Sequence, residues 1–230
     1  MAEERIVRLL KKVPLFARMS DVDVAQVADR CMHKNCHKDQ VILVEEELGQ
    51  TLFIILRGTV KITRGSDEGR EVIITMLKSG DFFGELSILD GKGRSASVVS
   101  MEESELLTLR RNDFLHLLEK YPQIGVEMLK VLADRIRRAD AMIENLTLQD
   151  AVGRVGSTII HVAEQTGYMR GPGMIIAKLP VQQDLANMAG TARETISRVM
   201  SVFEGKKLIE RDGHRVIIPD FEKFKREYWT

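Results

Sequence analysis

The sequence predicts an α+β protein made of three successive parts. Residues 40–111 contain short apolar or alternating runs that glycines separate, which is the pattern of strands joined by turns. Residues 122–146 predict one long helix. Beyond residue 151, helical stretches lead into a hairpin signal. A chain of 230 residues is long enough to bury more than one core.

Composition limits the class of protein before any motif is considered. Apolar residues make up 44% of the chain and charged residues 30%, as in soluble globular proteins. Basic and acidic residues are equal at 34 each, so only a local cluster of charge could indicate nucleic acid. The first residues alternate charged and apolar side chains, and no apolar run approaches the roughly 18 residues of a membrane span. We therefore expect a cytoplasmic protein with no membrane partner.

The two cysteines, Cys31 and Cys36, lie close to His33 and His37. Two thiols do not make a disulfide framework, and they suit a reducing compartment. The spacing of these four side chains matches no usual zinc pattern. We expect an exposed polar turn after a helix here, and no metal site.

The N-terminal part begins with two short helices and continues as strands. Residues 5–13 predict an amphipathic helix, and Ser20 or Asp21 is placed to cap a second one. The strand-like runs that follow are VILVEE, TLFIILRGTVKIT, EVIITML, SASVVS and ELLTLRR. Several strands with regular turns predict a closed or double-sheet β unit.

The segment FFGELSILDGKGRSASVV, from Phe82 to Val99, makes an odd strand. Its carboxylate, Glu85, precedes its guanidinium, Arg94, across a glycine-rich turn. Small residues on either side leave the backbone bare, which allows close approach of a ligand. The pattern favours a binding site, and the alternative is a plain salt bridge between the two side chains.

The long helix carries a narrow apolar stripe. Its members are spaced 3, 4, 3, 4 and 3 residues apart, which is the a/d pattern of a coiled coil. The intervening segment ADRIRRAD is heavily charged, and a narrow stripe favours a helix–helix seam over a broad core face. We therefore expect a homodimer. The seam residues are Leu129, Leu132, Ile136, Ala139, Ile143 and Leu146.

Two short helices with a glycine-containing turn follow further along the chain. The first, in VQQDLANMAG, ends at Gly190, and the spacing of Thr191 and Glu194 predicts a capping box for the second. The outward face of the second helix carries Arg193, Glu194 and Arg198. Arginine can bind guanine through O6 and N7, and glutamate can accept from cytosine N4. The arrangement predicts a helix-turn-helix that reads a major groove.

A hairpin signal comes directly after these helices. Asp212-Gly213 lies between alternating apolar residues, and Arg211, His214 and Arg215 surround its tip. A helix-turn-helix followed by a basic hairpin is a winged helix, and residues 221–229 predict a closing helix that covers the hairpin. These features together predict DNA binding.

No catalytic Ser/His/Asp set, metal cluster or pair of carboxylates has a recognisable spacing, so we expect no enzyme.

Together these motifs resemble the cyclic-AMP receptor protein family of bacterial transcription regulators. The resemblance spans residues 15–218 and is carried by GDFFGELSILDGKGRSA, ENLTLQDAVGRV and ARETISRV. It implies a jelly-roll (β-roll) nucleotide-sensing domain in 1–121, a dimerisation helix and hinge in 122–150, and a winged-helix DNA-binding domain in 151–230.

The resemblance also implies a cyclic nucleotide beside Glu85 and Arg94. The Glu85 carboxylate would accept from the ribose 2′-hydroxyl, and the Arg94 guanidinium would hold the cyclic phosphate. The further nucleotide-binding residues that it implies are Gly84, Leu86, Ser95, Ala96, Ala139 and Asp140.

At the base-reading positions, the family's usual pair of hydroxyls is replaced by Ala139 and Asp140. Asp140 is only an acceptor, so it can take the adenine N6 amino group or guanine N1–H and N2–H₂ together. Cyclic AMP is the first candidate effector. Cyclic GMP, another nucleotide or a less selective site are the alternatives.

For DNA, the resemblance assigns base reading to Arg193, Glu194 and Arg198. It implies TGTGA-like half-sites in an inverted repeat, spaced about one helical turn apart. Phosphate contacts fall to Gln182, Gln183 and Thr191. RNA polymerase is a further implied partner.

Other interpretations stay open at this point. One is a regulator of the same fold that ignores nucleotides, and another is a signalling module that binds no DNA. Oxygen-sensing relatives need more cysteines than Cys31 and Cys36. Haem-sensing relatives need ligands in the β-roll, and none of the five histidines lies between residues 40 and 111.

Overall fold

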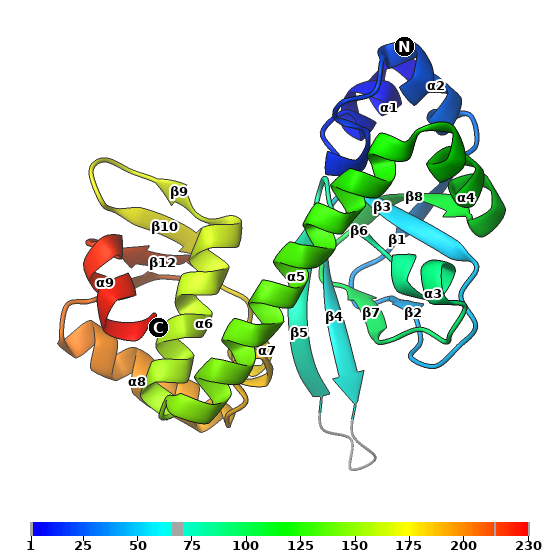
Figure 1. The fold of residues 1–230 in the computed structure, drawn as a ribbon. Coiled ribbons are helices and arrows are strands. Elements are labelled where there is room, and N and C mark those ends of the chain that lie inside the picture. Colours follow the sequence, from blue (N-terminus) through cyan, green and yellow to red (C-terminus); the bar gives the residue numbers. More distant parts are fainter. Residues whose placement is uncertain (1, 66–70, 214, 230) are drawn as a thin grey trace. The chain divides into compact units, whose positions relative to one another are not determined.

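The computed structural model describes residues 2–65, 71–213 and 215–229 (Figure 1). It divides into two compact units, residues 1–135 and 136–230. The boundary falls within the long helix α5, Pro122–Leu148, which therefore contributes to both units.

The first unit is a β-roll of two four-stranded antiparallel sheets. One sheet has the strand order β1-β8-β3-β6, and the other has the order β2-β7-β4-β5. The strands are β1 Met32–Cys36, β2 Val41–Leu43, β3 Thr51–Arg57, β4 Thr59–Gly65, β5 Glu71–Lys78, β6 Phe82–Phe83, β7 Ser97–Ser100 and β8 Ser104–Arg110. The helices before α5 are α1 Ala2–Leu10, the 3₁₀ helix Pro14–Phe16, α2 Asp21–Ala28, α3 Glu85–Asp90 and α4 Arg111–Lys120.

Strand β3 is buried on both of its faces. Phe53 and Ile55 point into the interior of the roll, where they pack with residues of both sheets such as Val98. Leu52 and Ile54 point to the opposite side, where the helices cover them. A strand between two apolar layers needs apolar residues at every position, which explains the unbroken run LFIIL.

The segment around the cysteines differs from the sequence prediction. Residues 32–36 form the edge strand β1, which pairs with β8 from Met32↔Thr108 to Cys36↔Ser104, so the predicted exposed turn is wrong. The Cys36 side chain is buried in the roll while the intervening polar side chains remain accessible. Among the described residues, no three His, Cys, Asp or Glu side chains gather as metal ligands would.

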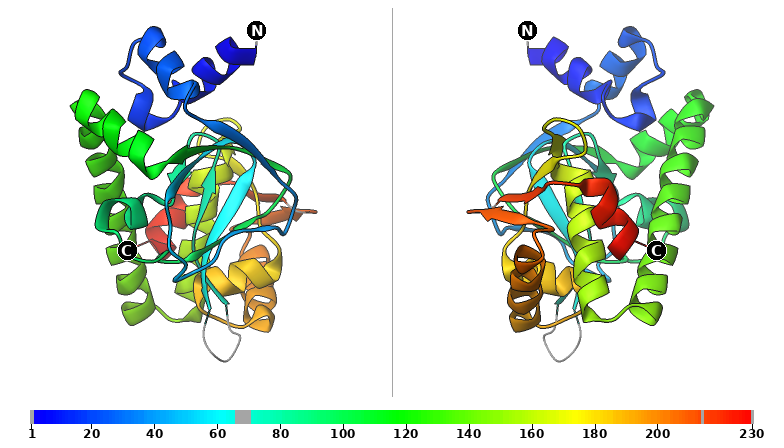
Figure 2. Two further views of the ribbon diagram at one scale, coloured as in Figure 1. Left: turned by 90° about the vertical axis from the view of Figure 1, so that its right-hand side faces the viewer. Right: turned by 90° about the vertical axis from the view of Figure 1, so that its left-hand side faces the viewer.

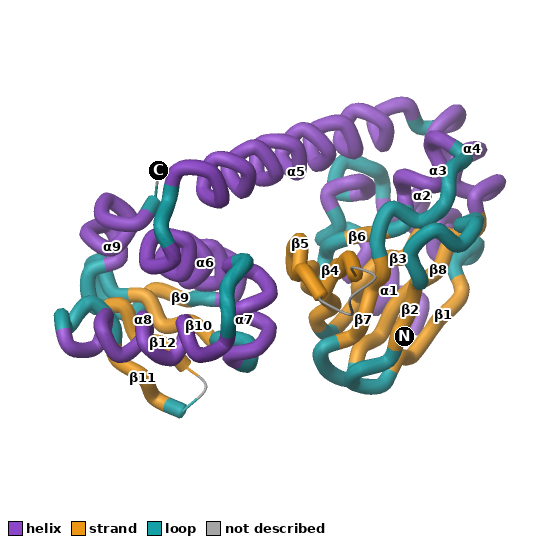
Figure 3. The backbone as a smooth tube through the Cα atoms, turned by 90° about the horizontal axis from the view of Figure 1, so that it is seen from below, coloured by secondary structure: helices purple, strands orange, loops and turns teal. Residues whose placement is uncertain are grey.

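The second unit packs four further helices around a small antiparallel sheet (Figure 3). The sheet has the strand order β11-β12-β10-β9, and its outer hairpin β11–β12 projects from the unit (Figure 2). The helices are α6 Ala151–Thr166, α7 Gln182–Ala189, α8 Arg193–Gly205 and α9 Phe221–Tyr228. The strands are β9 Tyr168–Met169, β10 Ile175–Lys178, β11 Glu210–Asp212 and β12 Arg215–Ile218.

The start of α8 also corrects a prediction. Ala192, not Thr191, is the N-cap residue, and no side chain caps this helix, so the predicted capping box is wrong. Gly190 ends α7 in the left-handed conformation with a φ of 58°. The backbone N–H of Thr191 then donates to the Ala186 carbonyl at 3.0 Å. Thr191 therefore belongs to the turn between the helices.

Helix α9 closes the second unit against α6 and α8. Phe224 and Tyr228 form an aromatic cluster with Phe203 of α8, with ring centroids 4.9 to 5.4 Å apart. The Ser157 hydroxyl of α6 donates to the Tyr228 carbonyl at 2.5 Å. The closing helix thus forms as predicted and packs on α6 and the end of α8. Among the described helices, none is both long and apolar enough to cross a membrane.

Candidate functional site

A buried arginine lies at the centre of the motif that the sequence singled out. The Arg94 side chain donates from Nη1 to the Gly84 carbonyl at 2.8 Å and to Ser87 Oγ at 2.7 Å. Its Nη2 donates to the Thr51 carbonyl at 2.9 Å. The residue is only 6% exposed. Three protein acceptors therefore hold this cation in place, and a guanidinium has five N–H donors in all.

Two glycines make room for this guanidinium. A Cβ atom on Gly49 would lie 2.2 Å from Arg94 Nε, and one on Gly84 would lie 2.8 Å from Arg94 Nη1. Gly84 also has a φ of +83°, a backbone conformation that residues other than glycine rarely adopt. The lack of a side chain at these positions is therefore a steric requirement for accommodating the Arg94 guanidinium.

Glu85 begins the short helix α3 and is 2% exposed. Its Oε1 accepts a hydrogen bond of 2.6 Å from Arg135 Nη1 of α5, so its ion-pair partner is Arg135 rather than Arg94. Arg135 also donates from Nη2 to the Phe82 carbonyl at 2.6 Å. The segment after Gly84 is thus one helical turn and a loop, not the odd strand that the sequence predicted. The contacts of Arg135 with Phe82 and Glu85 join the middle of α5 to the roll.

The second oxygen of this carboxylate, Glu85 Oε2, is buried and has no hydrogen-bond partner in the described structure. Burial raises the pKa of Glu85 above its usual value, and the nearby Arg135 and Arg94 cations oppose this rise only in part. Burial also lowers the pKa of Arg94, which the Glu85 and Glu47 carboxylates oppose. A buried acceptor without a donor is costly. A ligand hydroxyl would supply the missing donor.

The remaining predicted nucleotide residues fall into two groups. Leu86 on α3, exposed Ser95 and buried Ala96 adjoin Glu85 and Arg94 in sequence and belong to the same unit. Ala139 and Asp140 are exposed positions of α5 in the second unit.

Most of the predicted seam is an exposed apolar stripe, but Leu132 is half-buried and packs against the apolar core of the first unit. Leu129 is 67% exposed, Ile136 62%, Ile143 63% and Leu146 48%, whereas Ile124 and Met128 at the start of the same helix are buried. These large side chains therefore do not serve the core of either unit. Exposed apolar surface of this kind marks an interaction site.

The helix-turn-helix presents the predicted polar residues outward. Ile196, Val199 and Phe203 bury the inner face of α8, and the outer face exposes its charged residues. Gln183 of α7 is exposed and donates to Asn187 at 3.0 Å. The exposed charged residues of α8 include Arg193, Glu194 and Arg198.

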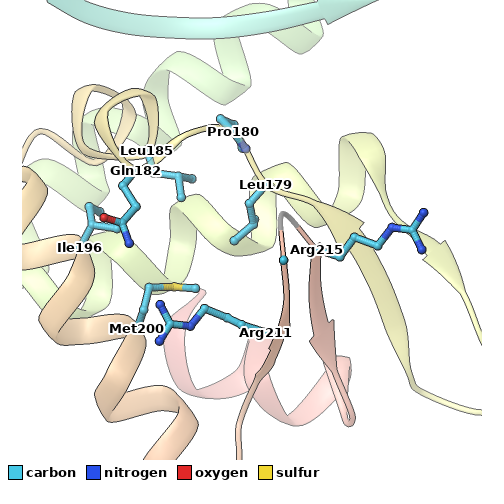
Figure 4. A pocket seen from close by; sticks show the side chains of 9 residues that line it. Leu179, Pro180, Gln182, Leu185, Ile196, Met200, Arg211 and Arg215 are labelled. Carbon is cyan, nitrogen blue, oxygen red and sulfur yellow. The ribbon is translucent and has the colours of Figure 1, made fainter.

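A pocket of about 240 Å³ separates the two helices from the hairpin (Figure 4). Its floor is apolar, and Gln182 lies at its α7 side. Arg211 points across the pocket toward Met200, while Arg215 extends away from it. The pocket residues are Leu179, Pro180, Gln182, Leu185, Ile196, Met200, Arg211, Gly213 and Arg215. His214, which the sequence also placed at the hairpin tip, lies outside the described residues.

Known proteins match this architecture over most of the chain. Residues 33–121 match the cyclic nucleotide-binding domain model, and residues 153–227 match the Crp-like helix-turn-helix domain model. The cyclic AMP receptor protein of Thermus thermophilus is 33% identical over 191 residues, which cover 83% of this chain and 85% of that protein. The chain belongs to the cyclic-AMP receptor protein family.

Two further comparisons show a similar sequence and a similar fold. The CRP-like cAMP-activated global transcriptional regulator of Mycobacterium tuberculosis is 28% identical over 218 residues, which cover 95% of this chain and 97% of that protein. A solved CooA mutant from Carboxydothermus hydrogenoformans shares the fold, with a TM-score of 0.76 at 23% identity, covering 88% of this chain and 90% of that chain. The α+β class and the order of β-roll, long helix and helix-turn-helix are confirmed. The protein is a cyclic-nucleotide-binding transcription regulator of the cyclic-AMP receptor protein family, and not an enzyme.

Four contributors to the site escaped the sequence reasoning. Gly49 lies in the loop before β3 and the Thr51 carbonyl belongs to the first residue of β3, both far from the motif in sequence. Ser87 lies within the motif, and Arg135 comes from α5. Ser87 could have been predicted, because it has a polar hydroxyl and lies only two residues after Glu85 in the same motif. For Arg135, which stands in the charged run RIRR, no local spacing distinguishes it from its neighbours.

Proposed function

We propose that this member of the cyclic-AMP receptor protein family is a homodimeric regulator, which cyclic AMP switches on for binding at TGTGA-like inverted repeats. The observation that carries the proposal is the pairing of a buried guanidinium, Arg94, with a buried and partly unsatisfied carboxylate, Glu85. Burying both groups without a ligand is expensive, and a sugar phosphate supplies one anion and one hydroxyl donor.

In this proposal the cyclic phosphate binds Arg94 and the ribose 2′-hydroxyl donates to Glu85 Oε2. Three of the five N–H donors of Arg94 already bond Gly84, Ser87 and Thr51, which orients the guanidinium and leaves two donors for an anion. The remaining phosphate contacts would come from the Ser95 hydroxyl and from backbone N–H groups of Gly84, Leu86 and Ala96.

The base is proposed to meet Ala139 and Asp140. Because the Asp140 carboxylate accepts but does not donate, it suits the amino group of adenine and also the N1–H and N2–H₂ of guanine. Cyclic AMP ranks first because the relatives from Thermus thermophilus and Mycobacterium tuberculosis bear that nucleotide in their names. Cyclic GMP is the direct competitor in any binding test.

The second copy is proposed to cover the apolar stripe of α5. The exposed residues Leu129, Ile136, Ile143 and Leu146 recur at heptad spacing, which suits a two-stranded seam. Two copies would present two winged helices, and an inverted repeat in DNA matches the two-fold symmetry of such a dimer.

On DNA, Arg193, Glu194 and Arg198 are proposed to read bases, with Gln182, Gln183 and Thr191 on phosphates. The first three are exposed at the start of α8, where a recognition helix contacts base edges. RNA polymerase is the further partner that we infer from the family, and the cytoplasm is the inferred location.

The switch is proposed to act through the segment Asn145–Asp150, which comprises the last turn of α5 and the two residues before α6. Arg154 joins this segment to the helix-turn-helix, because it donates from Nη1 to the Gln149 carbonyl and from Nε to the Ala189 carbonyl, each at 3.1 Å. A shift of the segment would therefore be felt at the end of α7. The nucleotide must bind the DNA-competent state more tightly than the other state, or it shifts nothing.

A titration of labelled duplex DNA tests the switch. The duplex carries a TGTGA inverted repeat, and fluorescence anisotropy is read without nucleotide, with cyclic AMP and with cyclic GMP. We expect tighter binding with cyclic AMP. Equal affinity in all three conditions would refute nucleotide control and leave a nucleotide-independent regulator of the same fold.

Calorimetry with each nucleotide tests the site directly. Arg94→Leu should abolish the heat of binding, because the cyclic phosphate loses its cation. Lys92→Leu is the matched control, since it removes an exposed cation two residues away. Full binding by folded Arg94→Leu protein would contradict the assignment.

A further inference from the structure

The acidic residue Glu204 occupies an unfavourable place on the recognition helix. It lies in the last turn of α8, where the helix dipole disfavours negative charge. It also lies on the helix that carries the DNA-reading residues, where a negative charge repels phosphate. A residue with both disadvantages needs a compensating partner.

Arg211 of the hairpin is that partner. Its Nε donates to Glu204 Oε1 at 2.7 Å, and its Nη2 donates to Glu204 Oε2 at 2.5 Å. This two-point pairing of guanidinium and carboxylate fixes the relative orientation of the two groups as well as their distance. Each partner lowers the charge that the other presents to DNA. The Arg211 hydrogen bond lowers the pKa of Glu204, and the pKa of Arg211 is raised in turn, so both groups stay charged.

Arg211, one partner of the ion pair, also lines the pocket between α8 and the hairpin. Arg211 leaves β11 and crosses toward Met200, which lies one turn before Glu204 on α8 (Figure 4). The pocket of about 240 Å³ lies between the hairpin and the helix. The ion pair is therefore a polar tie between this part of the hairpin and α8, beside a space that the protein does not fill.

We propose that Arg211 is a positioning residue, which fastens the wing β11–β12 to the recognition helix through Glu204 and makes no DNA contact of its own. The wing then keeps a fixed distance from α8. Arg215, on the partner strand of the same hairpin, is exposed and extends away from the pocket, so among the described residues of the wing it is a cation that can meet a phosphate (Figure 4). This inference rests on the family's DNA binding and is independent of the nucleotide effector.

The two possible roles of Arg211 predict opposite signs for one substitution. If Arg211 binds a phosphate, Glu204→Ala removes a competing anion and tightens DNA binding. If Arg211 positions the wing, Glu204→Ala frees the hairpin and weakens DNA binding, even though the protein has lost a negative charge. Electrostatic attraction to DNA alone cannot produce that weakening.

The test measures affinity for a mixed-sequence duplex over a range of salt concentrations, with the full-length protein. A duplex of mixed sequence suffices because we expect the wing to contact the sugar-phosphate backbone of DNA. The result therefore does not depend on the TGTGA-like repeat proposed above. The single variants Arg211→Ala and Glu204→Ala should each weaken binding about two- to fivefold, the range of an exposed ion pair. Their double variant should be no weaker than either single variant.

Rescue and a matched control complete the experiment. The exchanged variant, Glu204→Arg with Arg211→Glu, should restore binding to near the wild-type affinity. Arg215→Ala should lower the slope of log affinity against log salt by about 0.9, as loss of one phosphate contact does. Far-UV circular dichroism and thermal unfolding confirm that each variant is folded. Tighter binding by Glu204→Ala, or additive losses in the double variant, would overturn the proposal.

Discussion

Arg135 of α5 and Glu85 of α3 are fifty residues apart in sequence and form a hydrogen-bonded ion pair of 2.6 Å. The carboxylate is 2% exposed, and the guanidinium also lies over the Phe82 ring at 5.1 Å. The proposed ribose ligand and the middle of the long helix therefore share one carboxylate. Any movement of the Glu85 carboxylate therefore acts on α5 directly, through its hydrogen bond with Arg135.

Arg135→Ala should destabilise the first unit by about 3 kcal/mol, because it leaves the Glu85 carboxylate buried without its cation. Urea unfolding followed by circular dichroism measures the loss. Adding Glu85→Gln should recover part of it, since a neutral amide costs less to bury. Lys130→Ala breaks the exposed pair with Glu127 on the same helix and should change stability by less than about 0.5 kcal/mol. Equal effects of the two alanine variants would show that burial of Glu85 is not the cause.

Ser87→Ala should weaken cyclic-nucleotide binding about tenfold. Its hydroxyl accepts a 2.7 Å hydrogen bond from Arg94, and a bond to a charged group contributes about 1.5 kcal/mol to holding that group in place. Ser79→Ala is the control, because the Ser79 hydroxyl makes a bond of the same length to the Leu56 carbonyl. Calorimetry should find normal affinity in Ser79→Ala. Unchanged affinity in Ser87→Ala would mean that the carbonyls of Gly84 and Thr51 suffice to orient Arg94.

Gly156→Ala should destabilise the second unit, although alanine is the better helix former. A Cβ atom at Gly156 would lie 2.6 Å from both Cβ and Cγ of Tyr228, so α9 could not keep its place on α6. Gly125→Ala is the matched change within α5, where the nearest atom is the end of Leu118 at 4.0 Å. Thermal unfolding should show a loss for Gly156→Ala and a gain of about 0.5–1 kcal/mol for Gly125→Ala. A gain at both positions would show that α9 is loosely docked.

The sequence predicted the order of the parts because each has a strong local signal. Heptad spacing marks α5, the glycine-punctuated runs mark the roll, and Asp212-Gly213 marks the wing. The errors arose where local signals point elsewhere. Thr191 has the spacing of a capping box, yet the turn after Gly190 uses its backbone N–H and leaves the N-cap to Ala192. Polar residues 32–36 form a strand because β8 offers an open edge, which no local pattern reveals.

The candidate site was predicted in its chemistry but not in its pairing. Glu85 and Arg94 stand out as a carboxylate and a guanidinium around a glycine-rich turn, and both are buried. Their partners are contributed by distant segments, Thr51 by its carbonyl and Arg135 by its side chain. A backbone carbonyl has no sequence signature, and one arginine among three in RIRR cannot be chosen without the fold. Contacts between segments that are distant in sequence therefore decide the partners of Glu85 and Arg94, which the motif alone does not reveal.

The last prediction concerns His161, which lies on α6 with its Nε2 3.1 Å from Gln165 Nε2. Burial lowers the pKa of His161 below its ordinary value of 6.5, with help from the Arg138 cation and against the Glu164 carboxylate. The folded state therefore binds fewer protons than the unfolded state between the lowered pKa and about 6.5. The free energy of unfolding should rise with pH through this window and level off above about pH 6.5.

Urea unfolding at a series of pH values from about 5 to about 8 measures this slope, which one group limits to about 1.4 kcal/mol per pH unit. His161→Gln should flatten the curve below about pH 6.5, because glutamine does not titrate. A wild-type slope that persists in His161→Gln would assign the pH dependence to other groups.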